Sequence, residues 1–388
     1  MNLKEIITHY IKKKRSTILG VGPMSQNCID ATIEISEAYN IPILLIASRR
    51  QIESEVIGNG YVNKWYTRDF SNYIKKKNKK KNVIVCRDHG GPWQGDPDIE
   101  KKLNETDTIA NALQSFYDDI DNDFKILHID TSFRLDGKNV SYKKSFELFT
   151  YFFNKCREYA KKKNKKIYFE IGTEEQSSGI QEFLDIERNL KNIYDYCKER
   201  NIEQPIFVVL QTGTKVMEMR NVGAFEFPLR IKNQIPVEIQ LLKAVEISEK
   251  YNFFLKEHNA DYLTNDSLAW HPKMGINAVN VAPEFGVEET KALVELMNEK
   301  KQKKIKELFL ETAYNSHKWK KWIINKKKCS DYDKALIAGH YIFSQDSFKK
   351  IIYEFIANIK ISESTLNKYL KNRIKIKIFR YVNNFNLL

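Results

Sequence analysis

The stretch VIVCRDHGGPWQGD, residues 83–96, passes from a β-branched apolar run into a polar turn. The apolar run predicts a short buried strand. At its end stand Arg87, Asp88 and His89, followed by two glycines and a proline. A strand that ends in a polar turn occurs in many α/β proteins, so this stretch decides the fold only if the arrangement recurs along the chain.

The arrangement does recur, because eight apolar runs of strand length are spread over the first 290 residues. Segments with helix-like periodicity separate them, for example residues 25–40, 142–163 and 185–200. Strands that alternate with helices imply parallel βαβ units, and eight such units imply an α/β fold, the (β/α)8 TIM barrel. The eight runs are residues 17–21, 41–48, 82–88, 124–132, 166–175, 205–213, 252–262 and 278–283.

The pattern changes after residue 290, where helical periodicity continues without strand-like runs. An example is ETKALVELMNEKKQKKIKELFLETAY, residues 289–314. We therefore predict a barrel over residues 1–290, closed by strands between residues 17 and 286, and a C-terminal helical extension over residues 291–388.

Composition restricts the class of protein. The chain has 388 residues, of which 42% are hydrophobic and 12% aromatic, as in a globular protein. Nothing near the roughly 18 consecutive apolar residues of a membrane span occurs, and the first residues contain no apolar signal core, so we expect a cytoplasmic protein that does not enter a membrane. The five cysteines are scattered without a CxxC pair. Reduced, buried thiols are therefore expected instead of a zinc-thiolate site.

The net charge of +14 has two interpretations. It could be the electrostatic footprint of a nucleic-acid-binding protein. However, much of it lies in lysine runs that begin near residues 11, 73, 160 and 324. Three of these stand where a helix should end or a strand begin, and the helix macrodipole favours lysine at a helix C-terminus. No basic stripe is interleaved with aromatic residues, so we predict a solvated lysine-rich surface and no nucleic-acid partner.

Polar side chains follow the C-terminal ends of the predicted strands, which is where a TIM barrel carries its chemistry. The fold would therefore gather them around one pocket. We expect Asp88, Glu174 and Glu257 to act as catalytic carboxylates. A ring of charged and amide side chains suits a polyhydroxylated, phosphorylated substrate, and the residues expected to bind it are Arg49, Arg50, Gln51, Arg87, Asp130, Ser132, Thr173, Gln211, Asn259, Asp261 and Glu284.

Two strand ends carry a histidine next to a carboxylate: His89 after the third strand and His258 after the seventh. Imidazole with carboxylate is a ligand mixture suited to Zn²⁺, Mn²⁺ or Co²⁺. One such histidine is more often a turn residue, but two that face each other across the barrel mouth predict a shared divalent metal. Glu174, or else Gln211, would supply a further ligand. His128, inside ILHID, is interpreted as a core histidine.

Six motifs, in order between about residues 17 and 345, resemble one known family. They are GNGYVNKWYTRDF, RDHGGPWQ, ILHIDTS, EIGTEEQSSG, VVLQTG and KEHNADYLTNDSL. Together they are similar to the class II D-tagatose-1,6-bisphosphate aldolase non-catalytic subunit family, also labelled tagatose-6-phosphate kinases. The resemblance implies a class II aldolase-like TIM barrel and a place in sugar phosphate metabolism.

The sequence also departs from the pattern of that family. Class II aldolases bind their metal with three histidines, whereas the strand that should supply one of them has Gln211 and Gly213. After the second strand, where the family has an acidic stretch, this chain has IASRRQ with Arg49 and Arg50. A guanidinium could hold a phosphate or carboxylate bidentately, so we expect an anionic sugar other than tagatose.

Two functions stay open at this point. In the first, the protein is a metal-dependent lyase or epimerase that breaks the C3–C4 bond of a ketose phosphate or related anionic sugar, or re-forms that bond as a 4-epimerase. In the second, it is a non-catalytic subunit that stabilises or activates a separate aldolase, and a homo-oligomer is also open. The missing third histidine favours the second function, and the full ring of polar strand ends favours the first.

Overall fold

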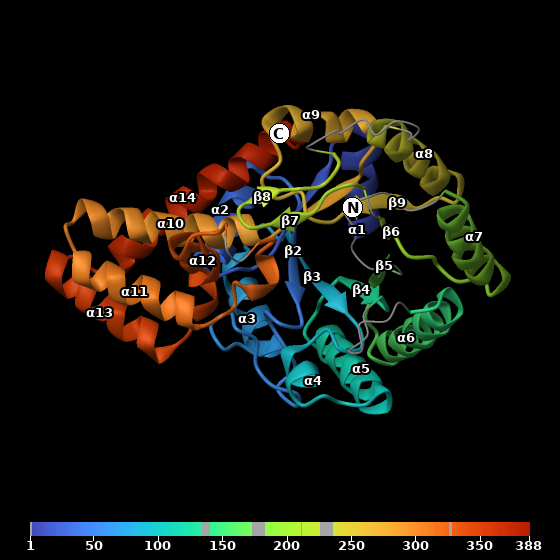
Figure 1. The fold of residues 1–388 in the computed structure, drawn as a ribbon. Coiled ribbons are helices and arrows are strands. Elements are labelled where there is room, and N and C mark those ends of the chain that lie inside the picture. Colours follow the sequence, from blue (N-terminus) through green and yellow to red (C-terminus); the bar gives the residue numbers. More distant parts are fainter. Residues whose placement is uncertain (1, 133–139, 173–182, 211, 226–235, 326–327) are drawn as a thin grey trace.

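The computed structural model describes residues 2–132, 140–172, 183–210, 212–225, 236–325 and 328–388. Its centre is a closed barrel of parallel strands, joined in the order β1, β2, β3, β4, β5, β6, β9, β10 and back to β1 (Figure 1). Each of the eight apolar runs forms one of these strands. The predicted α/β fold of the (β/α)8 type is therefore confirmed.

The strands are short and almost wholly buried, because the barrel interior covers one face and helices cover the other. Ile18 pairs with Ala278 to close the barrel, and β2 runs in register with β3 from Ile43 opposite Val83 onwards. The strands are β1 (Ile18–Val21), β2 (Ile43–Ser48), β3 (Val83–Gly90), β4 (Ile126–Asp130), β5 (Tyr168–Gly172), β6 (Phe207–Leu210), β9 (Phe254–Glu257) and β10 (Ala278–Val281).

Helices surround the barrel, and several of them begin at residues suited to capping. The side chains of Ser25, Asn104 and Ser141 each accept a hydrogen bond from the backbone N–H three residues further on. Their apolar faces are buried against the strands, as for Phe149 and Phe153 of α6. These helices are α2 (Gln26–Tyr39), α3 (Thr67–Lys77), α4 (Asp96–Glu100), α5 (Glu105–Asp121), α6 (Tyr142–Lys162), α7 (Phe183–Glu199), α8 (Val237–Lys250), α9 (Asn265–Met274) and α10 (Pro283–Glu299).

The N-terminal segment packs against the end of the barrel where the strands begin. It consists of α1 (Leu3–Thr8) and a π-helical turn (His9–Lys13). Ile7 and Ile11 are buried in one apolar cluster with the first residues of several strands, including Ile18. This apolar cluster fills the barrel interior at the end where the strands begin.

The C-terminal region is helical, as predicted. Three helices pack with the end of α10 around a second apolar core and project to one side of the barrel (Figure 1). The last helix returns to the barrel beside α2, where Ile378 and Tyr381 join the barrel core. The division at residue 290 stays a prediction, and it falls within α10. The elements are α11 (Lys303–Asn315), a 3₁₀ turn (Lys320–Trp322), α12 (Asp331–Ala338), a 3₁₀ turn (Gly339–Ile342), α13 (Asp346–Ile359) and α14 (Glu363–Asn384).

A small antiparallel hairpin follows β6 and is not predicted by the sequence pattern. It pairs β7 (Val216–Met217) with β8 (Arg220–Asn221). The side-chain amide of Asn221 donates hydrogen bonds to the backbone oxygens of Asn259 and Asp261. The hairpin is thereby attached to the loop after β9, at the mouth of the barrel.

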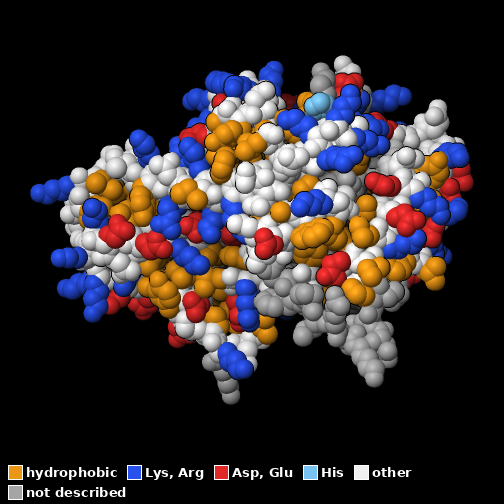
Figure 2. All heavy atoms as spheres, turned by 90° about the horizontal axis from the view of Figure 1, so that it is seen from above, with side chains coloured by type: hydrophobic (Ala, Val, Ile, Leu, Met, Phe, Trp, Pro, Cys, Tyr) orange, Lys and Arg blue, Asp and Glu red, His pale blue; other side chains and the backbone are white. Residues whose placement is uncertain are grey.

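The surface and the cysteines agree with the composition. Figure 2 shows Lys and Arg side chains spread over one face and interleaved with acidic and apolar ones. The absence of a nucleic-acid partner stays a prediction. Among the described residues, no helix is both long and apolar enough to cross a bilayer. All five cysteines are free thiols, and four of them are buried.

Candidate metal and substrate site

The end of β3 departs from regular strand geometry. The pairing of β3 with β4 shifts register between Arg87 and Gly90, and His89 has a φ of 44°, in the left-handed region. Consecutive residues on a regular strand point to opposite faces. A bulge re-aims side chains, and here it allows both Asp88 and His89 to face the mouth of the barrel.

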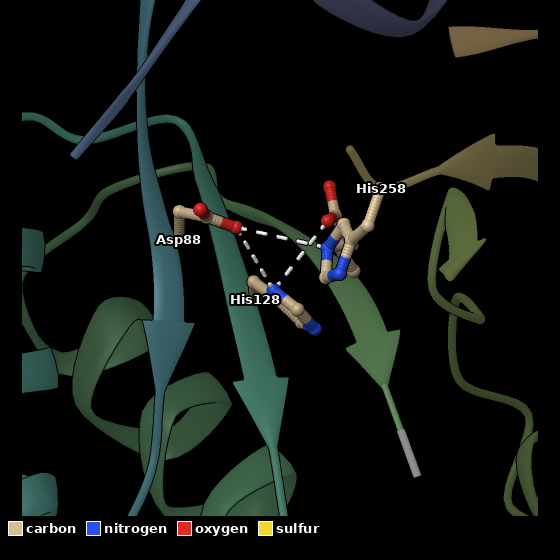
Figure 3. Close-up of side chains that lie close together, drawn as sticks. Asp88, His128 and His258 are labelled. Carbon is tan, nitrogen blue, oxygen red and sulfur yellow. Dashed lines mark hydrogen bonds and ion pairs between the residues drawn. The ribbon is translucent and has the colours of Figure 1, made fainter. Parts of the chain in front are cut away.

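Four side chains converge at the base of the mouth: Asp88 of β3, His128 of β4, Glu170 of β5 and His258 directly after β9. One oxygen or nitrogen atom of each lies within 4.8 Å of those of the others. Figure 3 shows Asp88, His128 and His258 pointing toward one another. Asp88 Oδ1 is 3.3 Å from His128 Nδ1 and 3.9 Å from His258 Nε2. Glu170 Oε1 is 3.6 Å from His128 Nδ1.

These separations fit a divalent cation. Metal bonds of about 2.1 Å in a tetrahedral arrangement place two ligand atoms about 3.4 Å apart, close to the two shortest separations. Glu170 Oε1 is buried and has no hydrogen-bond partner among the described residues. A buried carboxylate oxygen without a partner is costly, and a cation between these side chains would remove that cost. The four residues could therefore hold a metal.

Neighbouring groups orient these side chains. Lys256 Nζ donates a hydrogen bond of 2.6 Å to Glu170 Oε2, the carboxylate oxygen opposite the unpaired one. Asn280 Nδ2 donates a hydrogen bond of 3.2 Å to Asp88 Oδ1. Gly172 leaves room for the ring of His128, because a Cβ at this position would lie 2.5 Å from Nε2. Contacts of this kind fix the direction in which a metal ligand points.

The charges around the cluster favour protonation states that bind metals. Burial, and then the positive charge of His89, lower the pKa of His258 well below its usual value, so this imidazole is neutral. Burial by itself would raise the pKa of Asp88, but the charge of His89 and the hydrogen bond with His128 outweigh burial and lower it. Neutral imidazole and ionised carboxylate are the forms that coordinate metals.

His89 lies beside the cluster and is bound to a different carboxylate. Its Nδ1 is 2.6 Å from Asp130 Oδ2, and Asp130 also accepts hydrogen bonds from Gln94 Nε2 and Ser132 Oγ. Burial disfavours a charge on His89, but Asp88 and Asp130 outweigh it and raise the pKa of His89 to about 9. The ring is therefore an imidazolium at neutral pH. Its role as a metal ligand stays a prediction.

A cavity of about 670 Å³ opens at the mouth of the barrel. Barrel loops line it together with a segment of the C-terminal region, residues 317–322. Nine of the predicted site residues line the cavity: Arg50, Gln51, Asp88, His89, Asp130, Ser132, His258, Asn259 and Asp261. Three others, Thr173, Glu174 and Gln211, lie outside the described residues.

Two arginines predicted to bind substrate lie outside this cavity, which corrects their assignment. The guanidinium of Arg49 is buried and paired with Glu53 and Asp98. Arg87 is buried and paired with Asp119, with 2.6 Å between Nη2 and Oδ1. Each arginine is adjacent in sequence to a residue that faces the cavity. Because neighbouring side chains alternate in direction, these two point away from the cavity.

The predicted roles of two carboxylates are corrected for a similar reason. Glu257, predicted to be catalytic, points away from the cavity and pairs with His271 at 2.8 Å between Oε1 and Nε2. Glu284, predicted to bind substrate, is buried in the first turn of α10, where Oε2 accepts the backbone N–H of Tyr262. Both residues stabilise the wall of the barrel and do not reach into the cavity.

The sequence interpretation missed two members of the cluster. His128 was expected to be a core residue and is fully buried, but it lines the cavity. Glu170 received no role because it lies inside β5 and not at its tip. Side-chain alternation could have found both, since His128 and Glu170 stand two residues before Asp130 and Gly172, which line the cavity.

No protein-family model and no curated protein matches this sequence. Solved structures do match it. A probable tagatose 6 phosphate kinase from Sinorhizobium meliloti has a TM-score of 0.73 at 14% identity, covering 95% of this chain and 100% of that chain. A fructose-bisphosphate aldolase from Campylobacter jejuni has a TM-score of 0.58 at 11% identity, covering 100% and 94%. A fructuronate-tagaturonate epimerase from Cohnella laeviribosi has a TM-score of 0.57 at 11% identity, covering 96% and 81%.

At these identities the likeness is one of fold. The chain is a closed parallel (β/α)8 barrel whose fold is similar to that of these proteins, and a TIM barrel is what the resemblance of its motifs implied.

Proposed function

We propose that this protein is a divalent-metal-dependent enzyme of carbohydrate metabolism. It acts on a ketose phosphate or a related anionic ketose, by retro-aldol cleavage or by 4-epimerisation. The observation that carries the proposal is the convergence of two imidazoles and two carboxylates at the base of the cavity. The structural neighbours support the substrate class, because their names are those of a sugar phosphate kinase, an aldolase and a ketouronate epimerase.

Asp88, His128, Glu170 and His258 would hold the metal. A divalent cation supplies Lewis acidity, which polarises a ketose carbonyl and stabilises the negative charge that develops when a neighbouring C–C bond breaks. The mixture of nitrogen and oxygen ligands suits Zn²⁺, Mn²⁺ or Co²⁺.

Other residues of the cavity would bind and move protons. The imidazolium of His89, oriented by Asp130, can donate a hydrogen bond to a substrate oxygen that gains negative charge. Burial raises the pKa of Asp261 to about 8, so this carboxyl can exchange a proton near neutral pH. Aldol cleavage requires such an exchange at the C4 hydroxyl. Gln51 and Asn259 line the cavity and can bind the remaining hydroxyls.

One feature favours a second function. The cluster contains two histidines and not the three with which class II aldolases bind their metal. The chain could then be a non-catalytic subunit that holds sugar or metal and activates a separate aldolase. The two functions differ in whether the purified chain turns over substrate by itself.

Metal titration followed by assay tests the proposal. The chelated protein would be titrated calorimetrically with Zn²⁺, Mn²⁺ and Co²⁺, and then assayed for cleavage of tagatose 1,6-bisphosphate and for 4-epimerisation of fructuronate. We expect one metal ion per chain and metal-dependent turnover. Asp88→Asn should lose both, whereas Asp195→Asn, which changes an exposed carboxylate of α7, should lose neither.

Each negative outcome has a distinct meaning. Wild-type protein that binds no metal, or Asp88→Asn protein that binds it as the wild type does, would contradict the metal site. Stoichiometric metal with turnover only after a separate aldolase is added would favour the non-catalytic subunit.

A further inference from the structure

The rim of the cavity is completed by a segment far from the barrel in sequence. His317, Lys318 and the 3₁₀ turn Lys320–Trp322 line the same cavity as the four-residue cluster. The turn is held from two sides: the backbone N–H of Glu218 in the hairpin donates to the Trp322 oxygen at 2.6 Å, and Trp322 Nε1 donates to the Tyr341 hydroxyl at 3.0 Å. The C-terminal region therefore forms part of the wall of this cavity.

This rim is strongly basic. Arg50, Lys215, Lys318, Lys320 and Lys321 all line the cavity there. One carboxylate, Asp96, offsets part of the charge: its two oxygens lie 3.2 Å from Arg50 Nε and 3.4 Å from Lys318 Nζ. These contacts leave an excess of positive charge on the rim, whereas the carboxylates of the cluster lie at the base.

Lys321 forms no ion pair with any described residue. Its ammonium lies over the rings of Trp322 and Tyr341, 4.6 Å and 5.7 Å from their centroids. The positive charges of Arg50 and Lys318 repel this ammonium. The side chain stays accessible to solvent. A bound anion would offset the charge of Arg50 and Lys318 that Lys321 faces.

We propose that Lys321, with Arg50 and Lys318, forms a binding site for the anionic terminal group of the sugar, a phosphate or a carboxylate. The site specifies substrate charge, and it places the anion at the rim while the carbonyl end of the sugar reaches the four-residue cluster. The location of the reacting end rests on the proposed function, but anion binding itself does not. Lysine binds such groups as a point charge, and arginine as a planar fork.

Calorimetric binding to the full chain in the presence of a chelator tests this without metal-dependent turnover. The probes are tagatose 6-phosphate, fructuronate and uncharged tagatose. We expect at least one charged probe to bind about tenfold or more tightly than tagatose. Lys321→Gln should remove most of this preference, and Lys321→Arg should retain it. Lys350→Gln removes the same charge from an exposed position on α13, outside the cavity, and should change nothing.

The outcomes are separable. A loss confined to tagatose 6-phosphate identifies phosphate as the anion, and a loss confined to fructuronate identifies carboxylate. The proposal is overturned if no charged probe binds more tightly than tagatose, or if Lys321→Gln binds as the wild type does while both proteins unfold at the same temperature. If anion binding depends on Lys321 but the wild type binds no metal, the anion site stands and the proposed function fails.

Discussion

Buried charge occurs in two places in this barrel, and the two are built differently. The inner set, Asp88, His128, Glu170 and His258, faces the cavity. The outer set, Arg49, Arg87 and Glu257 with their partners, lies on the other side of the chain. Arg87 and Asp88 are neighbours in sequence, as are Glu257 and His258. Chemical type therefore does not distinguish the two sets, but the convergence of several ligand atoms on one point beside the cavity does.

In the outer set each charge meets a countercharge within the protein, for example Arg87 with Asp119 at 2.6 Å. In the inner set Glu170 Oε2 also has a countercharge, Lys256 Nζ at 2.6 Å. Glu170 Oε1, however, has no hydrogen-bond partner among the described residues and lies within 4.8 Å of ligand atoms of Asp88, His128 and His258. Buried ion pairs hold one arrangement of the fold, whereas ligand atoms of several side chains that converge beside a cavity could hold a cation.

Removing two of the residues proposed to hold the metal should give the largest effect. Combining His128→Ala with His258→Ala should weaken metal binding by a factor of at least about 1,000. The double variant should then lack about 4 kcal/mol of the stabilisation that bound metal gives the wild type. Without metal the double variant should still form the barrel, measured by circular dichroism. Thermal unfolding with and without Zn²⁺ measures the effect. If Zn²⁺ raises the Tm of the double variant as much as that of the wild type, the inner set does not hold the metal.

Substitutions in the outer set should lower the stability of the fold and leave metal binding unchanged. Arg87→Met leaves Asp119 buried without its partner, which should cost about 3–5 kcal/mol in the free energy of unfolding. Denaturant unfolding measures this loss, and metal stoichiometry should stay at the wild-type value. Arg188→Met breaks an exposed pair with Asp185 and should cost less than about 1 kcal/mol. Equal losses in the two variants would contradict the buried role of Arg87.

A smaller effect should appear in the pH dependence of stability. Burial disfavours a charge on His271, but the charge and hydrogen bond of Glu257 outweigh burial and raise its pKa. A raised folded-state pKa means that this pair contributes its full stability below about pH 6.5, the unfolded value, and loses it as the pH rises through the folded value.

The pH comparison needs a variant, because other groups titrate as well. His271→Asn should lose less stability than the wild type when denaturant unfolding is measured from pH 6 to pH 9. Parallel pH profiles for the two proteins would show that the pair has no such linkage.

The sequence alone determined the barrel and the order of its polar strand ends. Eight β-branched runs separated by periodic helices allow few other folds, because parallel strands need covering helices on the outside and an apolar interior. The same reasoning placed Asp88 and His258 at the mouth, since both stand at the end of an apolar run.

Only the tertiary structure decided which neighbouring side chains face inward. The bulge near His89 changes the alternation of β3, and its position depends on pairing with β4, which a single sequence does not display. Tertiary structure also brought Glu170 beside His128 and Lys321 to the rim of the same cavity. Contacts between residues this far apart in sequence depend on the packing of whole elements, and no local pattern of residues encodes them.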